Sequence, residues 1–202
     1  INRAAQNGKP ELAESLFLQM LQEYTKNKIG EKPRPGLLSV ALNAWTKQPR
    51  SKMKAAPERA EALLKKVEQD LQVFGALDIK PDAICYSCVI NCWAKSGRTD
   101  APDAALKLLR TMQQQHLAGD SSLRPDTITY AAVIGAFARA GQAKRTEALV
   151  EEMYADYLDG NDSAKPNVIA FSTVLAAWSK SKSRDAPQNA EALLERVAKL
   201  HC

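Results

Sequence analysis

Three cysteines lie close together near the middle of the chain, in the segment CYSCVINC. Cys85, Cys88 and Cys92 are three and four residues apart, and thiolates at such spacing can bind zinc or an iron–sulfur cluster. The same spacing also places three small apolar side chains on one face of a helix, where they would pack against neighbours. The surroundings of the helix that carries these cysteines therefore distinguish a metal site from a row of buried side chains.

The composition is that of an ordinary folded protein with a modest excess of positive charge. The chain has 202 residues, 45% hydrophobic and 25% charged, with a formal net charge of +5. No apolar run approaches the roughly 18 residues of a spanning helix, which excludes a membrane-embedded protein within this segment. The basic balance is compatible with a polyanionic partner without establishing one. The chain opens at Ile1 without a signal-like segment, so we expect it to be a piece of a longer protein.

One kind of predicted helix recurs five times along the chain. Apolar residues stand at helical spacing, as at Leu63, Leu64 and Val67, and four of the five segments open with a proline suited to a first helical turn. We call these segments B helices, and they span residues 10–20, 57–67, 102–112, 143–153 and 187–197.

A second kind of segment lies between the B helices, and we call these segments A helices. They span residues 35–47, 83–95, 127–139 and 168–180. Each ends in an aromatic residue, then a spacer and a base, and the aromatics are Trp45, Trp93, Phe137 and Trp178. A proline and a polar residue precede each A helix, as Pro33-Arg34, Pro81-Asp82, Pro125-Asp126 and Pro166-Asn167. The Asp or Asn of the last three pairs can cap the helix that follows.

An A helix followed by a B helix makes a helical hairpin, and hairpins that touch only their neighbours stack into a solenoid. We therefore predict an all-α solenoid fragment over residues 1–202. Its units are a partial repeat with a B helix at 1–34, repeats at 35–82, 83–126 and 127–167, and an incomplete terminal repeat at 168–202.

Superposition of the four A helices favours packing for the cysteines. Cys85 aligns with Leu37, Thr129 and Ala170; Cys88 with Val40, Ala132 and Thr173; Cys92 with Ala44, Ala136 and Ala177. Small or apolar residues fill these columns, so we predict a buried stripe and no metal or other cofactor. The remaining soft ligands, His116, His201 and Cys202, lie at distant loop or terminal positions. We also predict that the four aromatics belong to the core.

The hairpin unit resembles the pentatricopeptide repeat. The motif appears as ICYSCVINCWAKSG followed later by RPD, and as ITYAAVIGAFARAG followed by EALVEEM and KPN. The resemblance covers essentially the whole chain and implies a right-handed superhelical solenoid of antiparallel helix pairs. Two departures stand out: the aromatics are 48, 44 and 41 residues apart, longer than the usual family period, and Leu38 replaces the aromatic seen as Tyr86, Tyr130 and Phe171.

The resemblance implies sequence-specific binding of single-stranded RNA, with one base per repeat read by two side chains. Carried onto this sequence, the base-reading pairs are Ser39 with Asp82, Ser87 with Asp126, and Ala131 with Asn167, while Ser172 has no partner. The family uses Ser with Asp for guanine, so two repeats would favour G, and the Ala131 pair would discriminate little. A third column, Ile84, Ile128 and Ile169, would wedge against base faces, with Gly36 in that place in the first unit.

A basic residue ends every A helix, at Lys47, Lys95, Arg139 and Lys180. Cations spaced one per hairpin along one face can track a phosphate backbone, and binding would then fall steeply with salt. A plainer interpretation remains open for the residues that precede the A helices: Asp82, Asp126 and Asn167 can be helix caps alone. Capping is also compatible with base reading.

These observations favour an RNA-binding module, and the resemblance implies organellar RNA processing, stability or translation in a mitochondrion or plastid. The alternative is a protein-binding scaffold within a larger assembly, because a solenoid groove can also hold a peptide. An enzyme is not expected, since the chain contains no carboxylate pair with a histidine, no nucleophile elbow and no glycine-rich phosphate loop. Neither a small-molecule substrate nor a membrane partner is expected.

Overall fold

The computed structural model describes residues 1–27, 34, 36–48, 54–70 and 79–200, and these residues form helices and connecting turns without a strand. The A helices are α3 (Leu37–Thr46), α6 (Ala83–Ser96), α8 (Thr127–Arg139) and α10 (Val168–Lys180). The B helices are α2 (Pro10–Asn27), α4 (Ala56–Gln69), α7 (Ala101–Leu117), α9 (Ala143–Leu158) and α11 (Ala186–Leu200). All nine predicted helices are therefore confirmed, although α3 begins at Leu37 rather than at residue 35.

Three further elements were not predicted. A short helix, α1 (Asn2–Gln6), precedes α2 and packs against α2 and α3. Two 3-10 turns, η2 (Ser121–Leu123) and η3 (Asp162–Ala164), follow α7 and α9. They contribute to the length by which these repeats exceed the usual family period.

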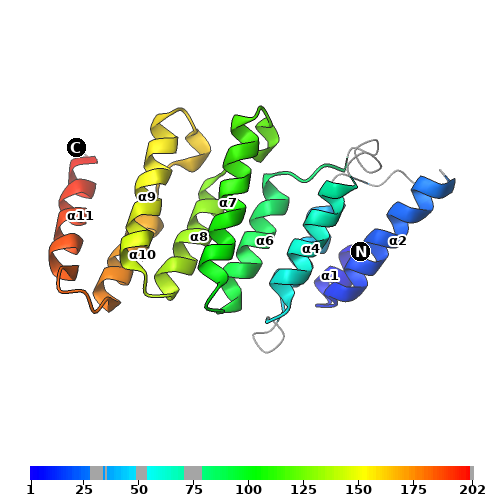
Figure 1. Ribbon diagram of the computed structural model, residues 1–202, viewed down its shortest axis with the longest axis horizontal. Coiled ribbons are helices and arrows are strands. Elements are labelled where there is room, and N and C mark those ends of the chain that lie inside the picture. Colours follow the sequence, from blue (N-terminus) through cyan, green and yellow to red (C-terminus); the bar gives the residue numbers. More distant parts are fainter. Residues whose placement is uncertain (28–33, 35, 49–53, 71–78, 201–202) are drawn as a thin grey trace.

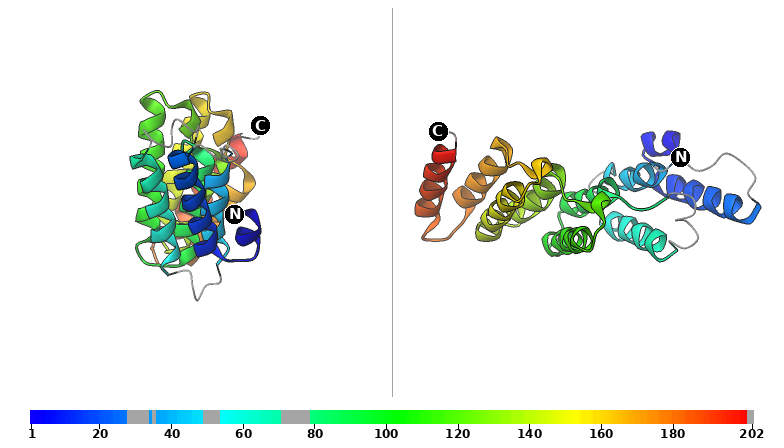
Figure 2. Two further views of the ribbon diagram at one scale, coloured as in Figure 1. Left: turned by 90° about the vertical axis from the view of Figure 1, so that its right-hand side faces the viewer. Right: turned by 90° about the horizontal axis from the view of Figure 1, so that it is seen from above.

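The helices stand side by side in one elongated row (Figure 1). Each A helix contacts the A helix of the neighbouring hairpin, as α3 with α6, α6 with α8, and α8 with α10. The B helices cover one side of this A layer, and α6 and α8 each contact the B helix before and after them (Figure 2). The all-α solenoid of antiparallel helix pairs is thus confirmed, while the right-handed sense of its superhelix stays a prediction.

Local capping explains where three A helices begin. The Oδ1 atoms of Asp82, Asp126 and Asn167 accept hydrogen bonds from the backbone N–H three residues later, at 2.9, 2.8 and 3.0 Å. The predicted N-caps are therefore confirmed, and such caps stabilise a helix by about 1 kcal/mol each. The first A helix differs, because Gly36 stands at its start and makes no side-chain cap. Pro33 of the fourth predicted pair lies outside the described residues.

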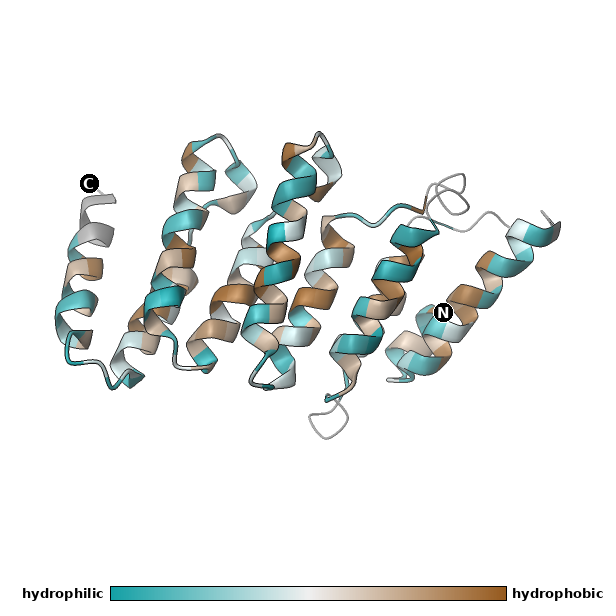
Figure 3. Cartoon of the chain, viewed as in Figure 1, coloured by the Kyte–Doolittle hydropathy of each residue, from teal (hydrophilic) through white to brown (hydrophobic). Residues whose placement is uncertain are grey.

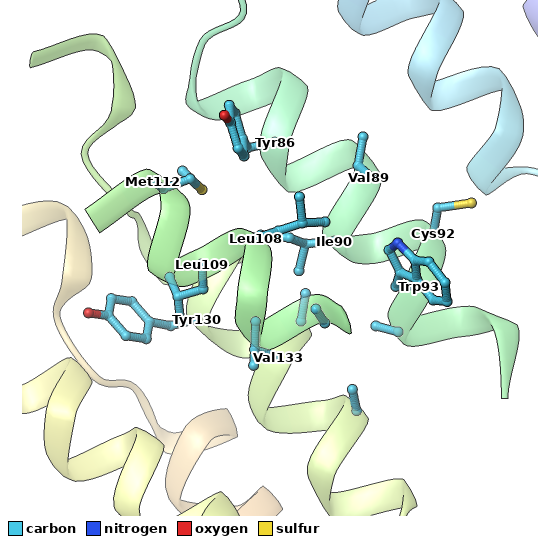
Figure 4. Packing of buried hydrophobic residues seen from close by; sticks show 14 of the residues in the cluster. Tyr86, Val89, Ile90, Cys92, Trp93, Leu108, Leu109, Met112, Tyr130 and Val133 are labelled. Atoms are coloured by element: carbon cyan, nitrogen blue, oxygen red, sulfur yellow. The ribbon is translucent and has the colours of Figure 1, made fainter. Parts of the chain in front are cut away.

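The aromatic residues that end the A helices form the centre of the core, as predicted. Trp45, Trp93, Phe137 and Trp178 are between 0 and 5% exposed. Figure 4 shows Trp93 beside Cys92 on α6, with Leu108 of α7 beside Ile90 and Leu109 beside Tyr130. The helices alternate hydrophobic and hydrophilic residues along their length, which is the pattern of elements buried on one side (Figure 3).

Each tryptophan also makes one polar contact to the preceding B helix. The indole N–H donates to a glutamate carboxylate: Trp45 to Glu14 at 3.2 Å, Trp93 to Glu61 at 2.9 Å, and Trp178 to Glu147 at 2.9 Å. Phe137 has no N–H, and the corresponding position of α7 holds Leu106, which packs against the core. This pairing is visible in the sequence, since the B-helix position is Glu where the following A helix has Trp and Leu where it has Phe.

Two tyrosines of the A helices contact successive B helices, which we also call the outer helices. The Tyr86 hydroxyl donates to Glu68 of α4 and lies 3.4 Å from the amide oxygen of Gln115 of α7. The Tyr130 hydroxyl accepts from Gln113 of α7 at 3.0 Å and donates to Asp156 of α9 at 3.1 Å. Burial raises the pKa of both tyrosines well above the ordinary value, so their hydroxyls keep their protons.

The cysteine question is settled by burial. Cys85 and Cys92 are 3% and 0% exposed within the core, and Cys88 is half-buried with Sγ 3.8 Å from the carbonyl oxygen of Ser39. Desolvation raises the pKa of Cys88 to about 11 and of Cys92 to about 12, and it raises that of Cys85 further. The burial of Cys85 and Cys92 within the apolar core confirms the packing prediction. His201 and Cys202 lie outside the described residues.

The described helices include none with the length and apolar character that crossing a bilayer requires.

Candidate nucleic-acid interface

Three large apolar side chains are exposed at one repeated position of the A layer. Ile84, Ile128 and Ile169 occupy the second residue of α6, α8 and α10, and they are 62, 63 and 69% exposed. A single exposed aliphatic residue is ordinary on a protein surface. The same residue exposed at the same helical position in three successive hairpins forms a regular apolar row. Because burial does not explain these side chains, packing between helices is not their role.

The predicted pair Ser87 and Asp126 is brought together by a residue that the sequence analysis did not single out. The Ser87 Oγ atom lies 2.6 Å from Thr129 Oγ1, and Thr129 Oγ1 donates to Asp126 Oδ1 at 2.6 Å. Ser87 is only 8% exposed, and Thr129 is fully buried. The two predicted reading groups therefore lie at the two ends of one short hydrogen-bond chain between α6 and α8.

The pair Ser39 and Asp82 has a different arrangement. Ser39 is half-buried as a residue, and its hydroxyl donates in an exposed position to the carbonyl oxygen of Gly36 in its own helix, at 2.9 Å. Asp82 caps α6, and Cys85 occupies the place that Thr129 has in α8. A thiol is a weaker hydrogen-bond donor than a hydroxyl. The Ser39 hydroxyl is thus held by its own helix and not by the neighbouring one.

The remaining predicted reading residues lie at the junction of α8 and α10 and on α10. Ala131 is half-buried, and Asn167 is exposed while it caps α10. Ser172 is exposed, and its hydroxyl donates to the carbonyl of Val168 at 2.6 Å. An open groove of about 420 Å³ runs between α8 and α10, with Ala131 and Ser172 among its lining residues and Arg139 and Lys180 further along the same helices.

The basic column contains two kinds of residue. Lys47, Lys95 and Lys180 are exposed, and they make no ion pair with any residue of the described ranges. Arg139 instead donates from Nη2 to the carbonyl oxygen of Ala94 at 2.7 Å, which connects α8 to the end of α6. Gly135 makes room for this guanidinium, because a Cβ atom there would lie 3.2 Å from Nη1.

Charges on the outer helices are largely paired with one another. Arg145 of α9 contacts Asp103 of α7 at 2.9 Å, and Arg59 of α4 contacts Glu14 of α2 at 3.3 Å. Arg110 of α7 makes a two-pronged contact to Glu152 of α9. Within the described residues the charges of Lys47, Lys95 and Lys180 are not offset by an ion pair, in contrast to those of Arg59, Arg110 and Arg145 on the B helices.

Stacked A–B hairpins with a regular row of side chains on the A layer define an α-solenoid repeat protein. Comparison with family models matches residues 107–181 to the pentatricopeptide repeat domain and residues 1–24 to the PPR repeat. These two matches support a pentatricopeptide repeat protein. Proteins of this family commonly bind RNA, are typically organellar and are generally non-catalytic. A comparison with curated proteins finds no significant match.

Proposed function

We propose that the chain binds single-stranded RNA in a sequence-specific manner through the exposed face of its A layer. The observation that carries this proposal is the row of isoleucines at Ile84, Ile128 and Ile169, each more than 60% exposed. Flat apolar bases can stack against such side chains, which would then be buried by the ligand rather than by the protein. One isoleucine per hairpin corresponds to one base per repeat.

Cations at the C-terminal ends of the A helices supply the second half of the interface. Lys95 follows Ile84 by 11 residues in α6, which corresponds to about 16 Å along a helix that rises 1.5 Å per residue. Lys47, Lys95 and Lys180 keep their charge available to phosphates, because it is not offset by neighbouring carboxylates in the described residues. Arg139 contributes its charge while it connects α8 to α6.

The proposed units are repeats at residues 35–82, 83–126 and 127–167, flanked by the partial units 1–34 and 168–202. Two pairs would each read guanine, Ser39 with Asp82 and Ser87 with Asp126. The carboxylate of each pair can accept hydrogen bonds from the N–H groups on the Watson–Crick edge of guanine. Ala131 with Asn167 lacks a hydroxyl and would discriminate little. Ser172 would read a base only together with a residue outside 1–202.

The proposed setting is RNA processing, stability or translation in a mitochondrion or plastid, without catalysis by this chain. The resemblance and the family match both support this setting, since the family works mostly in organelles. The competing role, a scaffold for another protein, would leave the isoleucine row and the lysines without a common ligand.

The decisive experiment measures RNA binding by fluorescence anisotropy as a function of salt, after selection of a preferred sequence from a random RNA pool. We expect enrichment of two adjacent guanines. Replacement of Lys47, Lys95 and Lys180 by Gln should weaken binding and flatten the slope of log K against log salt by about 2, or about 0.7 per lost phosphate contact.

The matched control replaces Lys66, Lys107 and Lys144 by Gln. These three lysines are exposed on the outer helices α4, α7 and α9, and the change in net charge is identical. The control should bind almost as the unmodified protein does. Equal weakening in both triple variants would contradict binding at the A layer. No retention of RNA at low salt would reject the proposal in favour of a protein-binding scaffold.

A further inference from the structure

We infer that Thr129 is a positioning residue for base recognition, because it fixes the direction in which the Ser87 hydroxyl donates. This inference rests on the proposed function and concerns the junction between α6 and α8. We infer that Ser87 and Asp126 present only hydrogen-bond acceptors to a base. In the corresponding pair, Ser39 with Asp82, the serine hydroxyl can also donate.

The geometry leaves one arrangement of protons in this chain of groups. A carboxylate at neutral pH accepts hydrogen bonds and donates none. Asp126 Oδ1 accepts from the Thr129 backbone N–H at 2.8 Å and from the Thr129 hydroxyl at 2.6 Å. The single hydroxyl proton of Thr129 is therefore directed at Asp126. Ser87, whose Oγ lies 2.6 Å from Thr129 Oγ1, must then donate its own proton to Thr129.

Burial keeps this arrangement in place. Thr129 is fully buried and Ser87 is 8% exposed, so water does not compete freely for either hydroxyl. A short hydrogen bond in such surroundings is stronger than its equivalent in water. What Ser87 can present outward is a lone pair at the floor of the junction, next to the carboxylate of Asp126.

Two neighbouring acceptors match only one of the four RNA bases. The Watson–Crick edge of guanine carries two adjacent donors, the ring N1–H and the 2-amino group. Adenine and cytosine each place an unprotonated ring nitrogen beside their amino group, and uracil places carbonyl oxygens on both sides of its N–H. These bases would set an acceptor against an acceptor, so the fixed proton direction should sharpen the choice of guanine.

The junction between α3 and α6 lacks this restriction. Cys85 stands where Thr129 stands in α8, and the Ser39 hydroxyl donates to the Gly36 carbonyl of its own helix. That carbonyl also accepts from the Val40 backbone N–H at 3.3 Å, and the bond to Ser39 lies in an exposed position. Ser39 can therefore turn and donate to a base, and it should tolerate bases other than guanine more readily.

The experiment compares the two guanine positions of the selected RNA within one protein. Each guanine is replaced in turn by adenine, and the ratio of the two Kd values gives the discrimination at that position. We expect one position of the unmodified protein to discriminate at least about tenfold and the other less. Because both RNAs bind the same protein, a change in its stability alone leaves the ratio unchanged.

Three variants test the role of Thr129. Thr129→Val should lower the larger ratio severalfold, and Thr129→Ser, which keeps the hydroxyl, should preserve it. Cys85→Thr should raise the smaller ratio, and this variant decides the question alone if Thr129→Val does not fold. Ratios that stay unchanged in Thr129→Val and Cys85→Thr, with RNA still bound, would overturn the inference while the proposed function stands. An unmodified protein that binds no RNA would reject both.

Discussion

Two kinds of junction join successive hairpins in the core, and they differ in one matched pair of residues. At three junctions a tryptophan of the A helix donates its indole N–H to a glutamate of the preceding B helix. Between α7 and α8, Phe137 and Leu106 occupy the two corresponding positions. Donor and acceptor are thus either both present or both replaced by apolar groups.

The comparison shows that the A-helix aromatic and its B-helix partner vary together, although the two residues lie about 31 residues apart in the sequence. Removing one partner of a buried hydrogen bond leaves the other unsatisfied, which costs about 1–3 kcal/mol, whereas replacing both by apolar groups can be nearly neutral. No described junction pairs an indole N–H with an apolar residue, or a glutamate with a phenylalanine, so none of them bears this loss of stability.

The largest effect should come from removal of the aromatic side chain itself. Trp93→Ala and Phe137→Ala each leave a large cavity in the core, so both should lower the free energy of unfolding by about 3–5 kcal/mol. Urea denaturation followed by circular dichroism measures the loss. A loss below about 1 kcal/mol at either residue would mean that the aromatic column does not hold the hairpins together.

Separating the partners of one polar junction should cost less. Glu61→Leu leaves the Trp93 indole N–H without its acceptor and should lower the unfolding free energy by about 1–3 kcal/mol. The double variant Glu61→Leu with Trp93→Phe copies the apolar junction and should recover most of that loss. Denaturant titrations of the single and double variants form a cycle, and simple additivity in that cycle would refute the coupling.

The reverse exchange sharpens the same comparison at the apolar junction. Phe137→Trp adds an indole N–H opposite Leu106 and an extra ring to a packed core, so it should destabilise the protein by about 1–3 kcal/mol. Adding Leu106→Glu should restore part of the loss. The two melting temperatures are compared directly, and a double variant no more stable than Phe137→Trp would count against the pairing rule.

The smallest predicted effect per residue contrasts the cysteines of α6 with the alanines of α8 in alkaline solution. The folded pKa values of Cys88 and Cys92 are raised to about 11 and about 12 by burial. Their contribution to stability is complete below the ordinary thiol pKa of about 8.5 and is lost as the pH rises toward those folded values. Between pH 7.5 and 9.5 the unfolding free energy should fall by about 1 kcal/mol per buried thiol.

The control for this alkaline loss follows the residues of α8. Ala132 and Ala136 occupy the two corresponding columns there, so the variant Cys88→Ala with Cys92→Ala removes the thiols with residues that the fold already accepts. Its stability should depend less on pH over the same range. An equal decline in both proteins would place the alkaline sensitivity elsewhere.

Much of the fold could be predicted because its signals are local. Apolar periodicity identified the A and B helices, and the Pro-Asp and Pro-Asn pairs identified the starts of α6, α8 and α10. The helix α1 escaped notice because five residues are too few for a periodic pattern, and it owes its stability to packing on α2 and α3. Alignment of the columns was enough to predict the burial of Cys85 and Cys92.

The site was less predictable, because its contacts join residues from different hairpins. The sequence placed Arg139 in one column with three lysines, and only the structure shows its bond to Ala94 across to α6. Thr129 likewise appeared only as a small residue in the column of Cys85. Its hydroxyl gains a role from Ser87, 42 residues earlier, through a contact that no local pattern records.

The tyrosine contacts between outer helices have a mechanical consequence. Tyr130 connects α7 to α9, because its phenol oxygen accepts from Gln113 and donates to Asp156. Tyr86 donates its single proton to Glu68 of α4 and also lies 3.4 Å from the amide oxygen of Gln115 of α7. The same column holds Leu38 and Phe171 in the first and last hairpins, and neither has a hydroxyl. Curvature should therefore be stiffest through α4–α9 and most compliant at the two ends. A long ligand would meet a constant spacing in the middle and an adjustable one at the margins.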